Sequence, residues 1–177
     1  PELMSMFKEF ADVRTAESLK LPVPEYDINI IKAEASPLQK ELVDRLAERA
    51  KRIRQRKPIR LREDADESSG KGMDNMLVVV KEGQSAALDP RIIDPSYPDN
   101  PDGKVNLCVN NVYDIYKETM DKKSTQVIFC DQSTPNAKAP FTVYGDIRDK
   151  LVGKGVPKGQ IAFIHDYDTP EKKEALF

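Results

Sequence analysis

Two short apolar segments alternate with helical patterns over the last 75 residues, and this order constrains the fold more than any other feature. The segments are Thr125–Asp131 (TQVIFCD) and Ile161–Ile164 (IAFI), and both are typical of buried strands. Apolar spacing predicts helices over residues 105–116 and 144–151, and a third helix beginning at Pro170. A helix–strand–helix–strand–helix order favours parallel strands with right-handed crossovers. We therefore expect an α/β fold with a partial parallel sheet flanked by helices.

The N-terminal part predicts a largely helical connector. Apolar residues at helical spacing indicate a short helix over residues 3–10, and alternation indicates a strand over Tyr26–Ile30. Ser36 can cap a following helix and Gln39 can complete a capping box, so a helix is expected from there to about Gln55.

A run of charged residues then predicts a domain boundary. The range Lys51–Arg62 contains seven basic residues and no acidic residue. Acidic and small residues follow up to Gly72, as in a solvated loop. We expect a connector region over residues 1–72 and a lobe over residues 73–177. The β-branched segment Met76–Val80 favours a strand at the start of that lobe, with a helix as the alternative.

Polar residues follow both apolar segments of the C-terminal half. In open parallel sheets, functional groups lie beyond the carboxyl ends of the strands, where hydroxyl groups and backbone amides can hold phosphates. Ordinary turns and helix caps use the same residue types, and the spacing alone is more typical of those. The candidate nucleic-acid-binding residues are Asp131, Gln132, Ser133, Thr134, His165 and Asp166.

A second candidate surface is the basic run at the end of the predicted N-terminal helix. Cations in a row can follow a nucleic-acid backbone, and each phosphate contact adds salt dependence. A solvated helix end, balanced by the acids that follow, is the simpler interpretation. The residues are Lys51, Arg52, Arg54, Arg56, Lys57, Arg60 and Arg62.

The sequence lacks the common motifs for phosphate binding, Mg²⁺ binding and serine hydrolysis. It contains no Gly-x-x-x-x-Gly-Lys-Ser/Thr loop, no Asp-Glu-x-His and no Gly-x-Ser-x-Gly, so we expect no catalytic residues. One histidine, His165, and two separated cysteines, Cys108 and Cys130, predict no metal site. Cysteines within apolar segments are expected to be reduced thiols, which favours a cytoplasmic protein. The net charge of −2 leaves only local patches for binding nucleic acid.

The C-terminal half resembles a known family. The residues STQVIFCDQSTP and FTVYGDIRDKLVGKGVPKGQIAFIHDYDTPEKKEALF are similar to the start of the second RecA-like lobe of superfamily-two helicases. The closest branch is the Swi/Snf-type ATPase lobe of large phage- and mobile-element-encoded helicase–methyltransferase proteins. MLVVVKEGQSAALDPRIID and KVNLCVNNVYDIYKETMDKKSTQ carry the same resemblance, which covers residues 73–177 closely and residues 3–62 more weakly.

The resemblance implies a non-catalytic fragment of a nucleic-acid-dependent ATPase, a helicase or translocase. It places residues 131–134 on a loop that faces nucleic acid. It implies a similar surface at the carboxyl end of the strand matched by residues 161–166. The phosphate loop, the magnesium carboxylates and the arginine finger would lie in other parts of a longer parent, so ATP and Mg²⁺ belong to the parent. The expected partners are DNA, the remainder of the helicase chain and a second copy bound through the edge of a truncated sheet.

Two other functions stay open at this point. A stand-alone α/β module could use half a RecA-like sheet to dock a partner or act as a scaffold. A Rossmann-type enzyme would require a glycine-rich first turn, and the loop Asp131–Pro140 contains no glycine. Salt-dependent binding to DNA distinguishes the helicase fragment from the docking module.

Overall fold

The computed structural model describes residues 25–55, 74–136 and 138–176, together with Met6, Phe10, Ala11 and Leu19. The chain divides into two units, Pro1–Ile30 and Ile31–Phe177. Most of the predicted helix over residues 3–10 and the predicted boundary at residue 72 fall outside the described residues, so both stay predictions.

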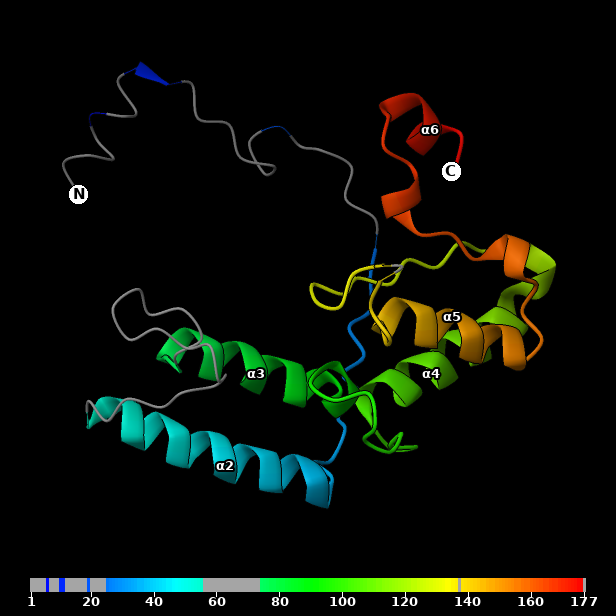
Figure 1. Cartoon of the computed structure of the whole chain (residues 1–177). Helices are drawn as coiled ribbons and strands as arrows, with labels where there is room; N and C mark the ends of the chain where they lie inside the picture. Colours follow the sequence, from blue (N-terminus) through cyan, green and yellow to red (C-terminus); the bar gives the residue numbers. More distant parts are fainter. Residues whose placement is uncertain are drawn as a thin grey trace. The chain divides into compact units, whose positions relative to one another are not determined.

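Helices make up the regular structure of the described residues, and no strand is found among them (Figure 1). None of these helices is both long enough and apolar enough to cross a membrane. In chain order, the elements are α2 (Pro37–Arg54), α3 (Met76–Leu88), η1 (Pro90–Ile92), α4 (Lys104–Thr119), η2 (Met120–Lys122), α5 (Val143–Gly153), η3 (Lys158–Gln160), η4 (Ile164–Asp166) and α6 (Pro170–Glu174).

Helix α2 confirms the prediction made from its capping sequence. Ser36 Oγ accepts from the Gln39 backbone N at 3.2 Å, and Gln39 Oε1 accepts from the Ser36 backbone N at 3.0 Å, which completes a capping box. Gln39 Nε2 also donates to Ala86 O at 2.9 Å, so the same side chain ties α2 to α3. Leu42 and Leu46 are the buried residues of α2, and α2 and α3 lie side by side (Figure 1).

Helix α3 corrects the strand favoured for Met76–Val80, because these residues form its first turns. Asn75 caps the helix, and its Oδ1 accepts from the backbone N of Leu77 at 3.0 Å and of Val78 at 3.1 Å. Val79 and Ala86 are buried, and their separation of two helical turns places them on one face. The cap and this packing outweigh the preference of β-branched residues for strands.

An ion pair holds α2 against α3. Arg49 of α2 donates to both carboxylate oxygens of Asp74, at 2.8 and 2.9 Å, and also contacts Glu82 of α3. The Asp74 side chain is fully buried, so its charge depends on this bidentate partner.

The main core lies between α4 and α5, whose positions agree with the predicted helices. Helix α5 ends at Gly153, and Gly155 adopts a φ of 104°, a left-handed conformation that glycine favours after a helix. The buried residues of this core are Val105, Val109, Val143, Ile147, Leu151 and Val156.

Arg91 joins three segments beside this core. It follows α3 in η1, and its Nη2 lies 2.7 Å from Asp89 Oδ2, 2.9 Å from Asp99 Oδ1 and 2.8 Å from Asp146 Oδ2. Lys150 Nζ adds contacts of 2.8 Å to Asp99 and 2.7 Å to Asp146. Two cations and three carboxylates therefore connect η1, the loop before α4, and α5.

The predicted parallel sheet is wrong for the described residues. Residues 124–130 and 161–163 form neither helix nor strand, no backbone hydrogen bond joins the two segments, and Ile164–Asp166 forms a 3₁₀ turn. The predicted strand over Tyr26–Ile30 is likewise absent, because these residues form no regular secondary structure. A strand requires a hydrogen-bonded neighbour, so apolar and β-branched composition alone does not produce one. A partial RecA-like sheet is therefore not the architecture of this part of the chain.

Replacing Arg91 by methionine should lower the free energy of unfolding by roughly 3 kcal/mol, because Asp89 would lose its counterion and Asp146 would keep only Lys150. Urea denaturation followed by circular dichroism measures this change. Arg52 is exposed on α2, so Arg52→Met is the matched control and should change the free energy by less than about 0.5 kcal/mol. Equal effects of the two substitutions would contradict the role given to Arg91.

Stability should also fall in acid through Asp99. Burial acts to raise the pKa of Asp99, but hydrogen bonds from Lys150 and Asn106 lower it below its ordinary value. A carboxyl pKa that is lower in the folded state stabilises the protein above about pH 4, and this contribution is lost as the pH falls through the folded pKa. Lys150→Met should therefore weaken the pH dependence of the urea midpoint between pH 7 and pH 3. A dependence as steep as that of the unmodified chain would contradict the assignment.

Candidate nucleic-acid interface

Tyr144, in the first turn of α5, contacts both segments that were predicted to end in functional residues. Its hydroxyl donates to Cys130 O at 2.7 Å. Its ring meets the rings of Phe163 and His165 edge to face, with centroid distances of 5.6 and 5.3 Å. The residues that follow 130 and those around 165 are thus brought to one end of α5, although no sheet is present in this part of the chain.

Two of the candidate side chains already have partners on α3 and α5. Ser133 adopts a φ of 55°, and its Oγ accepts from the Val143 backbone N at 2.9 Å at the start of α5. Gln132 Oε1 accepts from Ser85 Oγ of α3 at 3.3 Å. These are the contacts of a turn that caps a helix, which was the simpler interpretation of the sequence. A binding role for Gln132 and Ser133 stays a prediction.

The other four candidates are exposed at this end of α5. They are Asp131, Thr134, His165 and Asp166. His165 presents a ring beside Tyr144, and rings of this kind can stack on bases. The two carboxylates oppose phosphate binding, so this surface suits bases or polar groups better than a nucleic-acid backbone.

The environment of Tyr144 keeps its hydroxyl protonated. Burial is the largest cause that raises its pKa, and the negative charge that Cys130 and Asp131 can carry adds to it. A neutral hydroxyl is the form that donates to Cys130 O. The sequence marked Tyr144 only as an apolar position of a helix, because its hydroxyl contact joins residues 14 apart in the chain.

Both cysteines are free and half-buried in the structure. Burial raises the pKa of the Cys108 thiol, and the nearby Cys130 adds to this shift. Cys108 is therefore a weak nucleophile at neutral pH.

The basic candidate surface is described only in part. Lys51, Arg52 and Arg54 are exposed in the last turn of α2, and the remaining candidates, Arg56, Lys57, Arg60 and Arg62, lie outside the described residues. Their positions near the carboxyl end of the helix are also favourable for the helix dipole.

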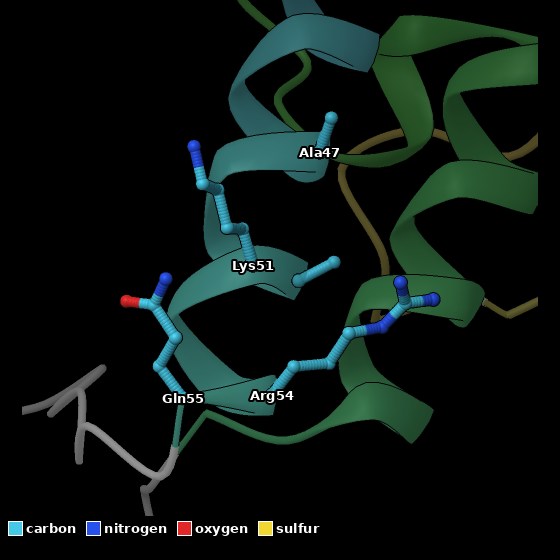
Figure 2. Close-up of a pocket in the computed structure, with 5 residues that line it drawn as sticks. Ala47, Lys51, Arg54 and Gln55 are labelled. Atoms are coloured by element: carbon cyan, nitrogen blue, oxygen red, sulfur yellow. The ribbon is translucent and has the colours of Figure 1, made fainter.

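A shallow hollow lies beside this helix end (Figure 2). Its lining residues are Ala47, Ala50, Lys51, Arg54 and Gln55. In Figure 2, Lys51 and Gln55 point to one side of α2 and Arg54 points to the other. The two cations do not converge on one point, so they suit successive groups along a polyanion better than a single small anion.

Asp89, Asp99 and Asp146 form the acidic cluster beside the core, with carboxylate oxygens within 4.8 Å of one another. Arg91 contacts all three carboxylates and Lys150 contacts two of them. Because these cations occupy the space between the carboxylates, we assign the cluster to holding the segments together rather than to binding a metal.

No protein-family model, curated protein or solved structure matches this chain. The resemblance to superfamily-two helicases therefore depends on the quoted residues alone.

Replacing Tyr144 by phenylalanine should lower the free energy of unfolding by about 1 kcal/mol, because the hydrogen bond to Cys130 O is lost while the ring packing is kept. Amide hydrogen exchange should become faster at residues 130–134 in this variant. Tyr26→Phe is the matched control, since Tyr26 is 76% exposed. Unchanged exchange at residues 130–134 would show that the hydroxyl does not position this turn.

Proposed function

We propose that this chain supplies a non-catalytic, DNA-contacting part of a nucleic-acid-dependent ATPase of the helicase or translocase class. The observation that carries the proposal is the contact of Tyr144 with Cys130, Phe163 and His165, since it gathers both predicted nucleic-acid-facing segments at one helix end. The sequence resemblance over residues 73–177 supports the same function. The proposal does not depend on a parallel sheet.

The two candidate surfaces, at the end of α2 and at the start of α5, differ in charge and therefore suit different parts of a nucleic acid. The exposed cations Lys51, Arg52 and Arg54 suit the phosphate backbone, which supplies most of the affinity of nonspecific binding. His165 and Tyr144 suit unpaired bases, which stack on aromatic rings without regard to sequence. In this proposal, α2 supplies salt-dependent affinity and the start of α5 supplies contacts to bases.

The chemistry of ATP is assigned to other parts of a longer parent. Phosphoryl transfer requires a phosphate cradle, Mg²⁺ and a cation that stabilises the transition state, and this sequence contains no phosphate-loop motif. ATP and Mg²⁺ are therefore cofactors of the proposed parent, and the remainder of the helicase chain is the proposed partner. A cytoplasmic location also stays a prediction.

A protein-docking module is the second candidate function. The exposed side chains of Val127 and Phe129, 59% and 91% accessible, favour it, because large apolar groups in water mark contact surfaces when they occur together.

Neutralising the basic helix end should weaken binding to DNA and reduce its salt dependence. In the combined variant Lys51→Gln, Arg52→Gln and Arg54→Gln, the slope of log affinity against log salt should fall by roughly 2 to 3 if each residue contacts a phosphate. Fluorescence anisotropy with labelled duplex and single-stranded DNA measures both quantities.

The matched control removes the same charge from exposed positions on α3 and α4 by Lys81→Gln, Lys104→Gln and Lys117→Gln. The slope should change little in this control. Equal losses in the two combined variants would indicate a general charge effect and would contradict a DNA-binding role for the end of α2. Salt-insensitive binding to a protein, with no binding to DNA, would favour the docking module.

The isolated chain should release no phosphate from ATP, with or without duplex DNA. A coupled phosphate assay with Mg²⁺ present measures this. Activity above the blank that copurifies with the chain, and that a mock purification lacks, would contradict the assignment of catalysis to the rest of the parent.

A further inference from the structure

The segment over residues 124–130, which forms neither helix nor strand, has one partly covered face and one more exposed face. Gln126 Nε2 donates to Val112 O of α4 at 3.0 Å, and Cys130 packs against the main core. Val127 and Phe129, which alternate with these residues, are 59% and 91% accessible, and Ile128 between them is 36% accessible. This alternation is that of a strand packed on helices through one face only.

The backbone of this segment is available for pairing. Between Thr125 and Phe129, no backbone-to-backbone hydrogen bond is made to the described part of the chain. The segment contains β-branched and aromatic residues and carries neither a charge nor a proline. Such a segment, when its edges are exposed, is a template for adding another strand.

Charges of opposite sign flank the apolar segment, and both are exposed. Lys123 precedes it and Asp131 follows it, each four residues from Val127. A second copy of the same segment is complementary to this pattern only if it runs in the opposite direction. Parallel, in-register copies would instead place like charges opposite each other.

We propose that two copies of this chain associate by antiparallel pairing of Thr125–Phe129, with Val127 opposite Val127 of the second copy. Thr125 of each copy then lies opposite Phe129 of the other. Lys123, whose φ of 50° places it just outside the paired segment, lies near Asp131 of the other copy. Sliding the pair by two residues in either direction brings Lys123 opposite Phe129 or Asp131 opposite Thr125, and both ion pairs are lost. Sliding it by one residue brings Lys122 opposite Asp131, but it also places residues of the covered face opposite residues of the exposed face. The charges and the two faces of the segment therefore select one register together.

This register also agrees with the two faces of the segment. Directly opposite residues of an antiparallel pair project to the same side. With Val127 opposite itself, the covered residues Gln126 and Cys130 of both copies share one side, where α4 of each copy lies. The exposed residues Val127 and Phe129 share the other side and cover one another in part. The contact is two-fold symmetric and closed, so it produces a dimer.

Disulfide formation tests the register directly. In a chain with Cys108→Ala and Cys130→Ala, the substitution Val127→Cys should crosslink two copies rapidly under mild oxidation. Opposite Cα atoms in an antiparallel pair lie about 4.5 or 5.5 Å apart, and disulfides span roughly 4.4–6.8 Å. Ile128→Cys is the matched control and should crosslink at least about tenfold more slowly, because its two copies are diagonal neighbours roughly 7–8 Å apart.

Charge exchange tests the flanking ion pairs. Lys123→Asp alone places two carboxylates near each other at both ends, and the dimer dissociation constant should rise roughly threefold to tenfold. Lys123 has a φ of 50°, a conformation that aspartate tolerates better than most residues. Adding Asp131→Lys should restore the dissociation constant to near its original value. Size-exclusion chromatography with light scattering over a range of concentrations measures these values, and circular dichroism verifies the helical content.

Three outcomes would overturn the proposal. A monomer at all concentrations, with no crosslinking of Val127→Cys, would exclude the dimer. Equal crosslinking of Val127→Cys and Ile128→Cys would indicate parallel or unspecific association. Failure of Asp131→Lys to rescue Lys123→Asp would exclude the register. None of these measurements involves DNA, so their failure is distinguishable from failure of the proposed function.

Discussion

The buried guanidinium group of Arg91 is the interaction on which the arrangement beside the main core depends. Its nearest carboxylates, on Asp89, Asp99 and Asp146, come from the end of α3, the loop before α4 and the first turns of α5. A charge removed from water is stable only where its counterions are in place, so the segments that carry them must come together. The start of α5 is thereby held near the end of α3, where Ser85 contacts Gln132. The candidate interface around Tyr144 is built on that same helix end.

The helices form where helix caps and apolar spacing agree. The two apolar segments predicted as strands show that such local patterns do not provide a pairing partner. The capping box at Ser36 and the cap at Asn75 each satisfy backbone donors within a few residues. The segment Thr125–Cys130 has the composition of a buried strand, but its backbone finds no ladder partner in the described chain. Its remaining apolar face, with Phe129 91% exposed, is therefore a surface for contact. The proposed pairing with a second copy follows from this unmet requirement and from the charges at its two ends.

The proposed function depends on a division of charge between two surfaces. Exposed lysine and arginine residues at the end of α2 are suited to phosphates, whereas Asp131 and Asp166 beside α5 repel them. The turn at Ser133 caps α5, and Gln132 contacts α3, so these two residues have structural contacts whatever else they bind. The base-facing role is thus better assigned to His165 beside Tyr144 than to the polar residues of the turn.

The sequence by itself determined the positions of α2, α4, α5 and α6, because capping and apolar spacing act between residues three or four apart. It also marked the polar residues after Cys130 and those around His165. Only the tertiary structure decided that Met76–Val80 is helical, that Tyr144 joins two distant segments, and that Arg91 collects three carboxylates. It also decided that the apolar segments remain unpaired in the described residues. The physical reason is that ladders, buried ion pairs and aromatic contacts join residues far apart in the chain, and local patterns do not specify which partners meet.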